Sequence, residues 1–411
     1  MKSVLRSIKS LFRRAPWPRL TFPTTGFETI SDDYIVEEEK FERFSEEAFY
    51  PVHIGEVFAA RYQVVGKLGF GVTSTVWLTR DLPKRAYTTL KIYTRDRQNY
   101  KEFEMYKVLS ETNPKHPGYR HIRTAQNKFT IPRAGGDHLC LVQKPMGDSL
   151  KDMLRRNPSR RFTTDLLRMS LIQLFLALDY VHSECKLVHT DIKLDNIFFE
   201  TDDESIFEDF VRWEMLNPIV RKTGEHPVYG SRGFRCSKAI GGLVLGDFGA
   251  ATRGDEIQSH TIQPSQLRCP EVLFGMNWSY PADIWNVGVM IWMCYEDSLL
   301  FRGKHPDGSG YKTAAHIAEV IAVLGPPPLE MLAQFPDSKS FFDDKGHWIA
   351  DVPIPEDRSL ESSEENLTGK EQEDFLEFVR CMLRWRPEDR LTARQLLDHP
   401  WLKAQDWRAK C

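Results

Sequence analysis

The stretch His189-Thr-Asp-Ile-Lys-Leu-Asp-Asn196 decides how the rest of this 411-residue sequence is interpreted. Asp191 is placed to accept the proton of an incoming hydroxyl, and Lys193 is placed to steady a transferring phosphoryl group. An Asp or Asn in a loop is more often a turn former than a catalytic residue, so the stretch needs support from elsewhere in the sequence.

Further motifs give this support through their order along the chain. A glycine-rich strand pair and a lysine in a strand come before the stretch, and Asp247-Phe-Gly249 and then Cys269-Pro-Glu271 come after it. Asn196 and Asp247 each offer a hard oxygen atom of the kind that binds Mg²⁺. The series predicts transfer of a phosphoryl group from a nucleotide to a hydroxyl.

Length and composition exclude several other functions. The chain is long enough for two or more lobes, and its 55 Lys and Arg against 58 Asp and Glu give no support for direct nucleic acid binding. The seven cysteines form no Cys-x-x-Cys pair, which argues against a disulfide framework or a zinc site and favours a reducing compartment. No apolar run reaches the length of a membrane-spanning helix, so we expect a soluble protein without a transmembrane segment.

Residues 1–50 are expected to form an extension outside the folded body. Residues 1–20 carry six basic side chains and no acidic one, with apolar residues at helical spacing. Such a segment is typical of a solvated tail, a surface-seeking helix or a mitochondrial transit peptide. Glu37-Glu-Glu39 and Glu46-Glu47 then form an acidic arm.

The next segment predicts a small lobe rich in strands. Residues 62–68 and 75–78 have the pattern of two strands, and Gly69 and Gly71 between them let backbone amides approach phosphate oxygens. Lys91 lies in the following expected strand, where on its own it would be taken as an exposed lysine.

A helix is expected from about residue 98 to residue 110. It offers Glu102 and Glu104 as partners that could hold Lys91 against the nucleotide phosphates. Glu102 is the better choice, because Glu104 then lies on a solvated face and an apolar stripe faces inward. That stripe consists of Met105, Tyr106 and Leu109.

The small lobe is expected to end with a strand at residues 138–143. The strand leads to Lys144-Pro-Met-Gly147, a hinge between lobes whose backbone would read the edge of adenine. A larger lobe then begins with a long helix, capped by Thr163 or Thr164, whose apolar stripe belongs to a core.

Buried polar side chains are expected in the larger lobe. His182 and His189 have no second ligand at metal spacing, so both are expected to be packed and hydrogen-bonded. Asp283 is expected to be a buried carboxylate with a structural role. Arg390 is expected to form a buried ion pair with Glu271.

Residues 200–242 are expected to be an insertion in a loop of the larger lobe. The segment begins acidic and later becomes glycine-rich and basic. Phe210 and Trp213 indicate that part of it packs on that lobe.

The ordered motifs resemble the eukaryotic protein kinase family over about residues 51–402, and Lys193 points to its serine/threonine branch. The resemblance implies an α+β, bilobal protein kinase fold: a small β-rich N-lobe with helix C (51–147), a larger, mainly α-helical C-lobe (148–403) and a tail (404–411). It also implies ATP and Mg²⁺ as cofactors. The implied site residues are Leu68, Gly69, Gly71, Ser74, Val76, Lys91, Glu102 and Met146 for ATP, Asn196 and Asp247 for the metal, Asp191 and Lys193 for catalysis, and Glu271, Asp283 and Arg390 for structure.

Several features are similar more specifically to the SR-protein kinases and their fungal-type relatives. These are residues 50–58, Ser74-Thr-Val-Trp77, Thr190 in place of the usual Arg, the insertion before Asp247, and residues 316–325. This likeness implies a link to mRNA splicing, a monomer, protein substrates that include arginine/serine-rich ones, and a location in cytoplasm and nucleus. Mitochondria are the alternative if the basic N-terminus is a transit peptide.

The chain departs from the family pattern at several positions. Because the Thr190 hydroxyl cannot grip a phosphate as an Arg would, we predict activity that does not depend on activation-loop phosphorylation. Thr88-Thr89 replaces Val-Ala, Gln143 occupies a gatekeeper position that is usually apolar, and Pro264 replaces a Thr that touches the catalytic Asp. The SR-protein kinases dock arginine-serine peptides through acids where this chain has Tyr311-Lys-Thr-Ala-Ala315.

Two other functions compete with an active protein kinase. A pseudokinase scaffold would bind partners through the same fold without turnover, but the catalytic and nucleotide-binding residues favour the enzyme. These residues are Lys91, Glu102, Asp191, Asn196 and Asp247. A small-molecule kinase is disfavoured by elements that build a peptide platform, namely Cys269-Pro-Glu271, Asp283-Ile-Trp285 and Arg390.

Overall fold

The computed structural model describes residues 15–403, apart from residues 43, 96–99 and 336. The chain forms two compact units, here called the first and the second unit. The first comprises Met1–Phe103, Thr124–Gly147 and Thr201–Ile240, and the second comprises Glu104–Arg123, Asp148–Glu200 and Gly241–Cys411. The boundary between Gly147 and Asp148 falls directly after the segment 144–147, which the sequence suggested as a hinge. Most of the basic amphipathic N-terminus and the expected tail at 404–411 lie outside the described residues.

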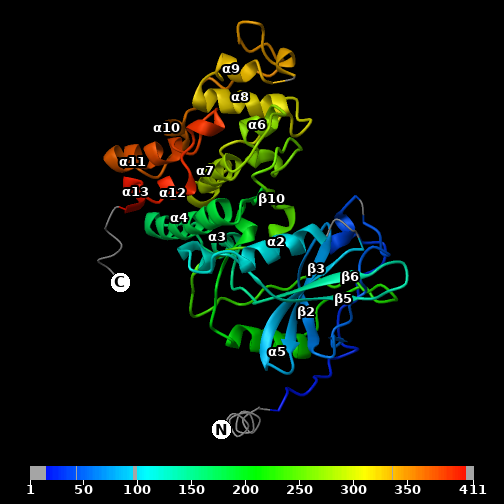
Figure 1. Ribbon diagram of the computed structural model, residues 1–411. Helices are drawn as coiled ribbons and strands as arrows, with labels where there is room; N and C mark the ends of the chain where they lie inside the picture. The colour runs from blue at the N-terminus through cyan, green and yellow to red at the C-terminus, as the bar shows by residue number, and fades with distance from the viewer. Residues whose placement is uncertain (1–14, 43, 96–99, 336, 404–411) are drawn as a thin grey trace. The chain divides into compact units, whose positions relative to one another are not determined.

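The first unit is built on a six-stranded antiparallel sheet with the strand order β1-β2-β3-β4-β6-β5 (Figure 1). Its strands are β1 (Val57–Phe58), β2 (Tyr62–Gly71), β3 (Ser74–Asp81), β4 (Ala86–Tyr93), β5 (Ala125–Ile131) and β6 (His138–Gln143). Strand β5 was not expected, because its residues are polar and largely exposed and so lack the apolar pattern of the other strands.

Both faces of this sheet are covered by apolar side chains. Successive residues of a strand point to opposite faces, and Val64 belongs to one buried cluster whereas Val65 belongs to another. The first cluster, which contains Trp77, Leu90 and Val142, lies on the face of Val64. The second lies on the face of Val65 and is completed by residues from elsewhere in the chain.

The segment 201–240 supplies much of this second cluster. Its helix α5 (Ser205–Leu216) lies beside β2 (Figure 1). Three of its apolar side chains pack in the cluster, namely Ile206, Phe207 and Phe210. The expectation of a loop insertion that packs on the larger lobe is therefore wrong: the amphipathic helix covers an apolar face of the small, strand-rich unit, and Trp213 is 57% exposed.

The described residues 15–50 also pack on the first unit, and we call them the N-terminal strap. The Leu20 N–H donates to Gln63 Oε1 (2.9 Å), and Gln63 Nε2 donates back to the Leu20 carbonyl (2.7 Å). Phe22 is buried in the second apolar cluster. Glu38, in a short 3-10 turn, pairs with the fully buried ammonium of Lys67 on β2. The expectation that this segment lies outside the folded body is wrong for the described part.

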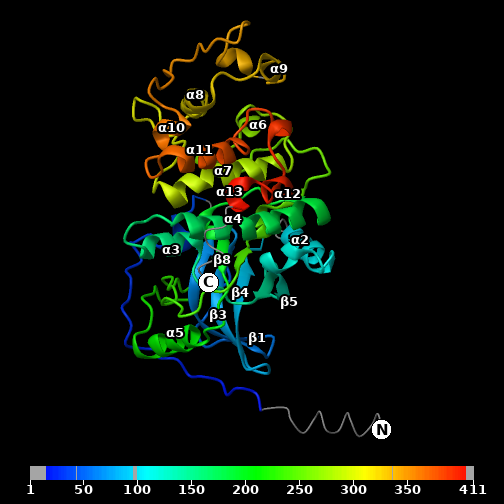
Figure 2. The same cartoon turned by 90° about the vertical axis from the view of Figure 1, so that its left-hand side faces the viewer.

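The second unit is mainly helical. The boundary between the units falls inside α2 (Tyr100–Glu111), and the helices that follow are α3 (Leu150–Arg156), α4 (Thr164–Asp179), α6 (Pro270–Leu273), α7 (Pro281–Tyr295), α8 (Thr313–Leu324), α9 (Leu329–Leu332), α10 (Leu360–Ser363), α11 (Gly369–Arg380), α12 (Ala393–Leu396) and α13 (Pro400–Lys403). Thr163 is the cap of α4, because its side-chain oxygen accepts the Leu166 N–H at 3.3 Å. Figure 2 shows the largely buried α7 between α4 and α11.

Two short antiparallel strand pairs hold the loops that carry the expected catalytic residues. Strand β7 (Leu187–Val188) pairs with β10 (Thr252–Arg253), and β8 (Ile197–Phe199) pairs with β9 (Leu243–Leu245). The loops 189–196 and 246–251 are therefore each fixed at both ends. Within the part of the chain that the structure describes, no helix is both long and apolar enough to cross a bilayer.

Candidate active site

Three of the expected site residues meet in one loop of the second unit. Lys193 Nζ lies 2.7 Å from Asp191 Oδ2, and Asn196 Nδ2 donates to the same oxygen at 2.9 Å. Asn196 Nδ2 also donates to the Asp191 backbone carbonyl at 2.9 Å. The Asp191 side chain is 22% exposed. Its carboxylate is thus oriented by two neighbours and remains accessible.

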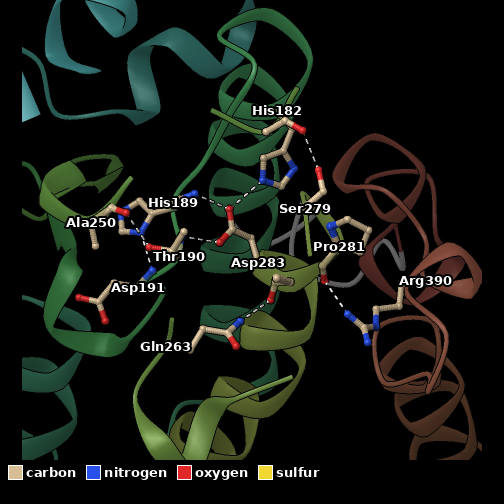
Figure 3. Close-up of polar contacts among 12 residues, drawn as sticks. His182, His189, Thr190, Asp191, Ala250, Gln263, Ser279, Pro281, Asp283 and Arg390 are labelled. Carbon is tan, nitrogen blue, oxygen red and sulfur yellow. Dashed lines mark hydrogen bonds and ion pairs between the residues drawn. The ribbon is translucent and has the colours of Figure 1, made fainter. Parts of the chain in front are cut away.

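Asp283, in the first turn of α7, fixes the backbone that leads to Asp191. Its carboxylate is fully buried and accepts the N–H groups of His189 (2.7 Å) and Thr190 (2.8 Å), as Figure 3 shows. His182 Nε2 lies 2.9 Å from the same carboxylate. Thr190 has φ +68°, a conformation that is costly for a β-branched residue. The buried carboxylate stabilises it through charge-assisted hydrogen bonds.

The same loop is tied to the segment that contains Asp247. His189 Nε2 lies 2.9 Å from the Gly246 carbonyl, and the Thr190 hydroxyl donates to the Ala250 carbonyl at 2.9 Å (Figure 3). The His189 ring packs edge-on against the buried Phe248 ring at 4.8 Å. Both histidines singled out in the sequence are therefore packed and hydrogen-bonded, as expected.

Asn196 and Asp247 provide the oxygen atoms that a Mg²⁺ ion would need. The amide nitrogen of Asn196 is engaged by Asp191, so this amide offers its oxygen as a ligand. Asp247 adopts the left-handed conformation (φ +55°, ψ +71°), directly before the buried Phe248. An amide oxygen and a carboxylate are a donor set that fits a hard divalent cation.

A buried ion pair joins α6 to the C-terminal part of the second unit. Arg390 Nη1 and Nη2 each lie 2.7 Å from one oxygen of Glu271, and both side chains are buried. Arg390 also donates to the Pro281 carbonyl at the start of α7 (3.0 Å), as Figure 3 shows. The expected pair is confirmed, and it anchors the helix that carries Asp283.

Gln263 is a positioning residue that the sequence did not reveal. Its side chain donates to the Ala282 carbonyl at the start of α7 and accepts the Cys269 N–H, both at 2.9 Å. Its own φ is +69°. Gln263 therefore holds the segment around Pro264 against α7. The only available signal, a left-handed backbone at a non-glycine residue, is invisible in a sequence.

The first unit contains a second group of expected site residues. Lys91 Nζ, on β4, lies 3.0 Å from Glu102 Oε1 and 3.3 Å from Oε2, on α2. Glu102 is buried and Glu104 is exposed, so the choice between the two acids is confirmed. The start of the expected helix, at residue 98, lies outside the described residues.

The two glycines at the end of β2, Gly69 and Gly71, are not required by the packing of the described residues. Neither Gly69 nor Gly71 has a positive φ. A methyl group added at Gly69 would meet no atom within 4 Å, and one at Gly71 would meet only Ser74 Oγ at 3.9 Å. Nothing in the described fold requires glycine here, which fits a site where a ligand approaches the backbone closely. Val76, which pairs with Gly69 and with Lys91, lies beside them.

Comparison with known proteins places these features in a family. Residues 62–402 match the protein kinase domain. A serine/threonine protein kinase of Aspergillus fumigatus is 41% identical over 402 residues, covering 97% of this chain and 98% of the relative. A serine/threonine-protein kinase SRPK of Physarum polycephalum is 27% identical over 395 residues, covering 89% of this chain and 91% of the relative.

A solved kinase domain supports the same fold. Its crystal structure matches this chain with a TM-score of 0.66 at 21% identity, and the match covers 87% of this chain and all of that one. The protein kinase fold expected from the sequence is therefore confirmed. With a domain match over most of its length and a relative aligned from end to end, the chain belongs to the protein kinase family and is a serine/threonine protein kinase.

Proposed function

We propose that this protein transfers the γ-phosphoryl group of ATP to serine and threonine hydroxyls of protein substrates, with Mg²⁺ held by Asn196 and Asp247. The observation that carries the proposal is the arrangement around Asp191, whose accessible carboxylate is oriented by Lys193 and Asn196. When bound, the cation would neutralise charge on the phosphate oxygens.

The residues of the chain act by positioning and by charge. Asp191 accepts the proton of the substrate hydroxyl at a carboxylate oxygen, and Lys193 supplies a positive charge 2.7 Å from that carboxylate. In the first unit, Lys91 is held by Glu102 and offers its ammonium to nucleotide phosphates. The amides near Gly69 and Gly71 would donate to phosphate oxygens, with Leu68, Ser74, Val76 and Met146 completing the nucleotide site.

We also place the protein among the SR-protein-kinase-like enzymes, with a role in the regulation of mRNA splicing. The relative named SRPK, at 27% identity over 89% of this chain, supports this proposal. It makes arginine/serine-rich proteins the first substrates to test. We further propose a monomer that acts in the cytoplasm and nucleus. A mitochondrial location is the alternative if the basic N-terminus, residues 1–20, is a transit peptide.

The surroundings of α8 make the choice of substrate an experimental question. Ala315 and Ala318 are buried and pack against Val352, so this face of α8 is apolar rather than acidic. Lys304 and Lys312, just before the helix, are exposed. A peptide panel therefore needs an acidic member beside the arginine-rich one.

The test is Mg²⁺-dependent transfer of labelled γ-phosphate from ATP to an arginine-serine peptide, a basic generic peptide and an acidic peptide. Asp191→Ala is expected to abolish transfer, whereas Asp195→Ala, an exposed acid of the same loop, should leave it largely intact. ATP binding by the wild type without transfer to any of the peptides would favour the pseudokinase scaffold instead. The preferred peptide identifies the substrate class.

A further inference from the structure

One buried hydrogen-bond donor of the first unit is unpaired within the part of the chain that the structure describes. Gln143 is the last residue of β6 and is 3% exposed. Its side-chain Nε2 has no hydrogen-bond partner among the described residues. Its backbone carbonyl, in contrast, accepts the Thr89 hydroxyl at 3.3 Å. An unsatisfied buried donor is destabilising, and native proteins contain few of them.

The register of the sheet shows which face carries this donor. Gln143 pairs with Thr89, and Leu141, two residues earlier on β6, pairs with Lys91. Lys91 pairs in turn with Val76. Because directly paired residues share a face and alternate residues of a strand do too, Gln143 lies on the face of Lys91. The neighbouring Val142 belongs to the apolar cluster of the opposite face.

This face is the one on which the nucleotide is expected. It carries Lys91, fixed by Glu102, and Val76, the partner of Gly69. Gln143 also directly precedes the Lys144-Pro-Met-Gly147 segment, whose backbone is expected to read the edge of the base. A donor at the end of β6 is therefore placed near the base and away from the phosphates.

We propose that the Gln143 side-chain amide donates a hydrogen bond from Nε2 to an acceptor atom of the nucleotide base, which makes Gln143 a specificity-determining residue. The inference rests on the proposed function, because it requires that the protein bind a nucleotide. A purine ring presents nitrogen acceptors to such a donor. An apolar side chain of similar length would fill the same space without the cost of an unpaired donor, so the amide is explained by a ligand that satisfies it.

The test uses Gln143→Met, which keeps the length of the side chain and removes the amide. Two measurements on the full-length protein are expected to move in opposite directions. Without nucleotide, Tm should rise by about 1–3 °C because a buried unsatisfied donor is gone. The Kd for ATP, measured by calorimetry, should increase about fivefold to tenfold because one hydrogen bond to the ligand is lost. The matched control is Gln126→Met on β5, an exposed position where neither value should change.

Deaza analogues of ATP, each lacking one ring nitrogen, locate the acceptor. For one of them, wild type and Gln143→Met should bind equally well, because the bond is already lost in the ligand. The inference is overturned if Gln143→Met binds ATP as tightly as the wild type, or if every analogue keeps the difference. It is also overturned if ligand-free Gln143→Met is less stable. Failure of the proposed function would look different, with no Asp191-dependent transfer even where ATP binds normally.

Discussion

At the scale of single residues, the catalytic loop depends on a few buried polar contacts that hold an unfavourable backbone. Thr190 has φ +68°. The backbone N–H groups of His189 and Thr190 both donate hydrogen bonds to the Asp283 carboxylate. The side chain that performs the expected chemistry, Asp191, follows directly. Substitutions at Asp283 or Thr190 should therefore lower turnover, although neither residue is expected to touch the substrate.

Asp283→Asn should reduce turnover at least tenfold. The substitution replaces one accepting oxygen by an N–H₂ group, which then faces a backbone N–H, and each lost bond to a charged group is worth about 1.5–3 kcal/mol. Steady-state kinetics and urea unfolding measure the two effects. Asp344→Asn, at a side chain that is 92% exposed, is the control and should behave like the wild type. Normal turnover in Asp283→Asn would show that the loop is held by other contacts.

Activity should not depend on a phosphate in the activation loop. The Thr190 hydroxyl donates to the Ala250 carbonyl at 2.9 Å, and it has no positive charge with which to bind a phosphate. Phosphatase treatment is therefore expected to leave kcat within twofold of its starting value. A loss of turnover after treatment, with an unchanged unfolding curve, would contradict this prediction.

His316 should make the second unit sensitive to acid. Burial, together with the nearby cations Arg268 and Arg358, lowers the pKa of His316 to about 3. The unfolded chain binds a proton near pH 6.5 and the folded chain does not, so this contribution to stability is complete above pH 6.5 and is lost as the pH falls towards 3. The slope is about 1.4 kcal/mol per pH unit.

His316→Gln tests this prediction by urea unfolding at pH 7 and pH 5. The wild type should lose about 2 kcal/mol more than the variant over this interval, which is the slope multiplied by 1.5 units. His347→Gln, at an exposed histidine, should keep the full wild-type loss. Equal losses in wild type and His316→Gln would assign the acid sensitivity to other groups.

At the scale of elements, the N-terminal strap completes the first unit by neutralising a buried cation. The Lys67 ammonium on β2 is fully buried, pairs with Glu38 and donates to the Tyr229 carbonyl at 2.9 Å. The N-terminal strap and the segment 201–240 therefore both contact the Lys67 side chain, on the strand that also contains Gly69. The acidic character of the strap, which the sequence suggested was exposed, is used to balance Lys67 and Lys222.

Glu38→Gln should lower the free energy of unfolding by up to about 3–5 kcal/mol, because it removes the nearer carboxylate partner of the buried Lys67 ammonium and leaves only Glu37, 3.7 Å away. Lys67→Met alone should also destabilise, since it leaves the buried Glu38 carboxylate unpaired. The double variant should recover most of the loss, because an apolar replacement of both partners is often tolerated. Chemical denaturation of the four proteins measures the coupling. Purely additive losses would mean that the two side chains do not interact.

At the scale of the whole molecule, the chain returns to the first unit after it has already begun the second. Residues 201–240 leave and re-enter the second unit at one point, where the Glu200 carbonyl accepts the Gly241 N–H at 2.8 Å. In sequence this looks like a loop. In structure it covers Val65 and Leu78, whose side chains are fully buried.

Excision of residues 201–240, with a two-residue Gly-Ser link, should expose this apolar face. Each large side chain that loses its cover is worth about 1.5–3 kcal/mol, so Tm should fall and binding of a hydrophobic dye should rise. Trp213→Ser, on the exposed face of α5, should change neither. If the protein without residues 201–240 had the wild-type Tm, this segment would be a dispensable insertion after all.

The amino-acid sequence by itself determined the protein family and predicted most residues of the candidate active site. Asp191, Lys193 and Asn196 lie within six positions of one another, so local backbone geometry brings them together. Glu102 was identified as the partner of Lys91 because helical periodicity separates a buried acid from an exposed one. The pair of Arg390 and Glu271 was also expected from the sequence.

Only the tertiary structure decided on which unit residues 15–50 and 201–240 pack, and which polar side chains are buried. Lys67 and Gln263 are ordinary polar residues in the sequence, and their roles depend on contacts across 29 and 19 positions of the chain. Periodicity and propensity act over a few residues, whereas burial depends on which distant segment covers a surface. Residues close together in the sequence therefore predicted the candidate site, whereas the long-range contacts that hold its surroundings in place could not be predicted.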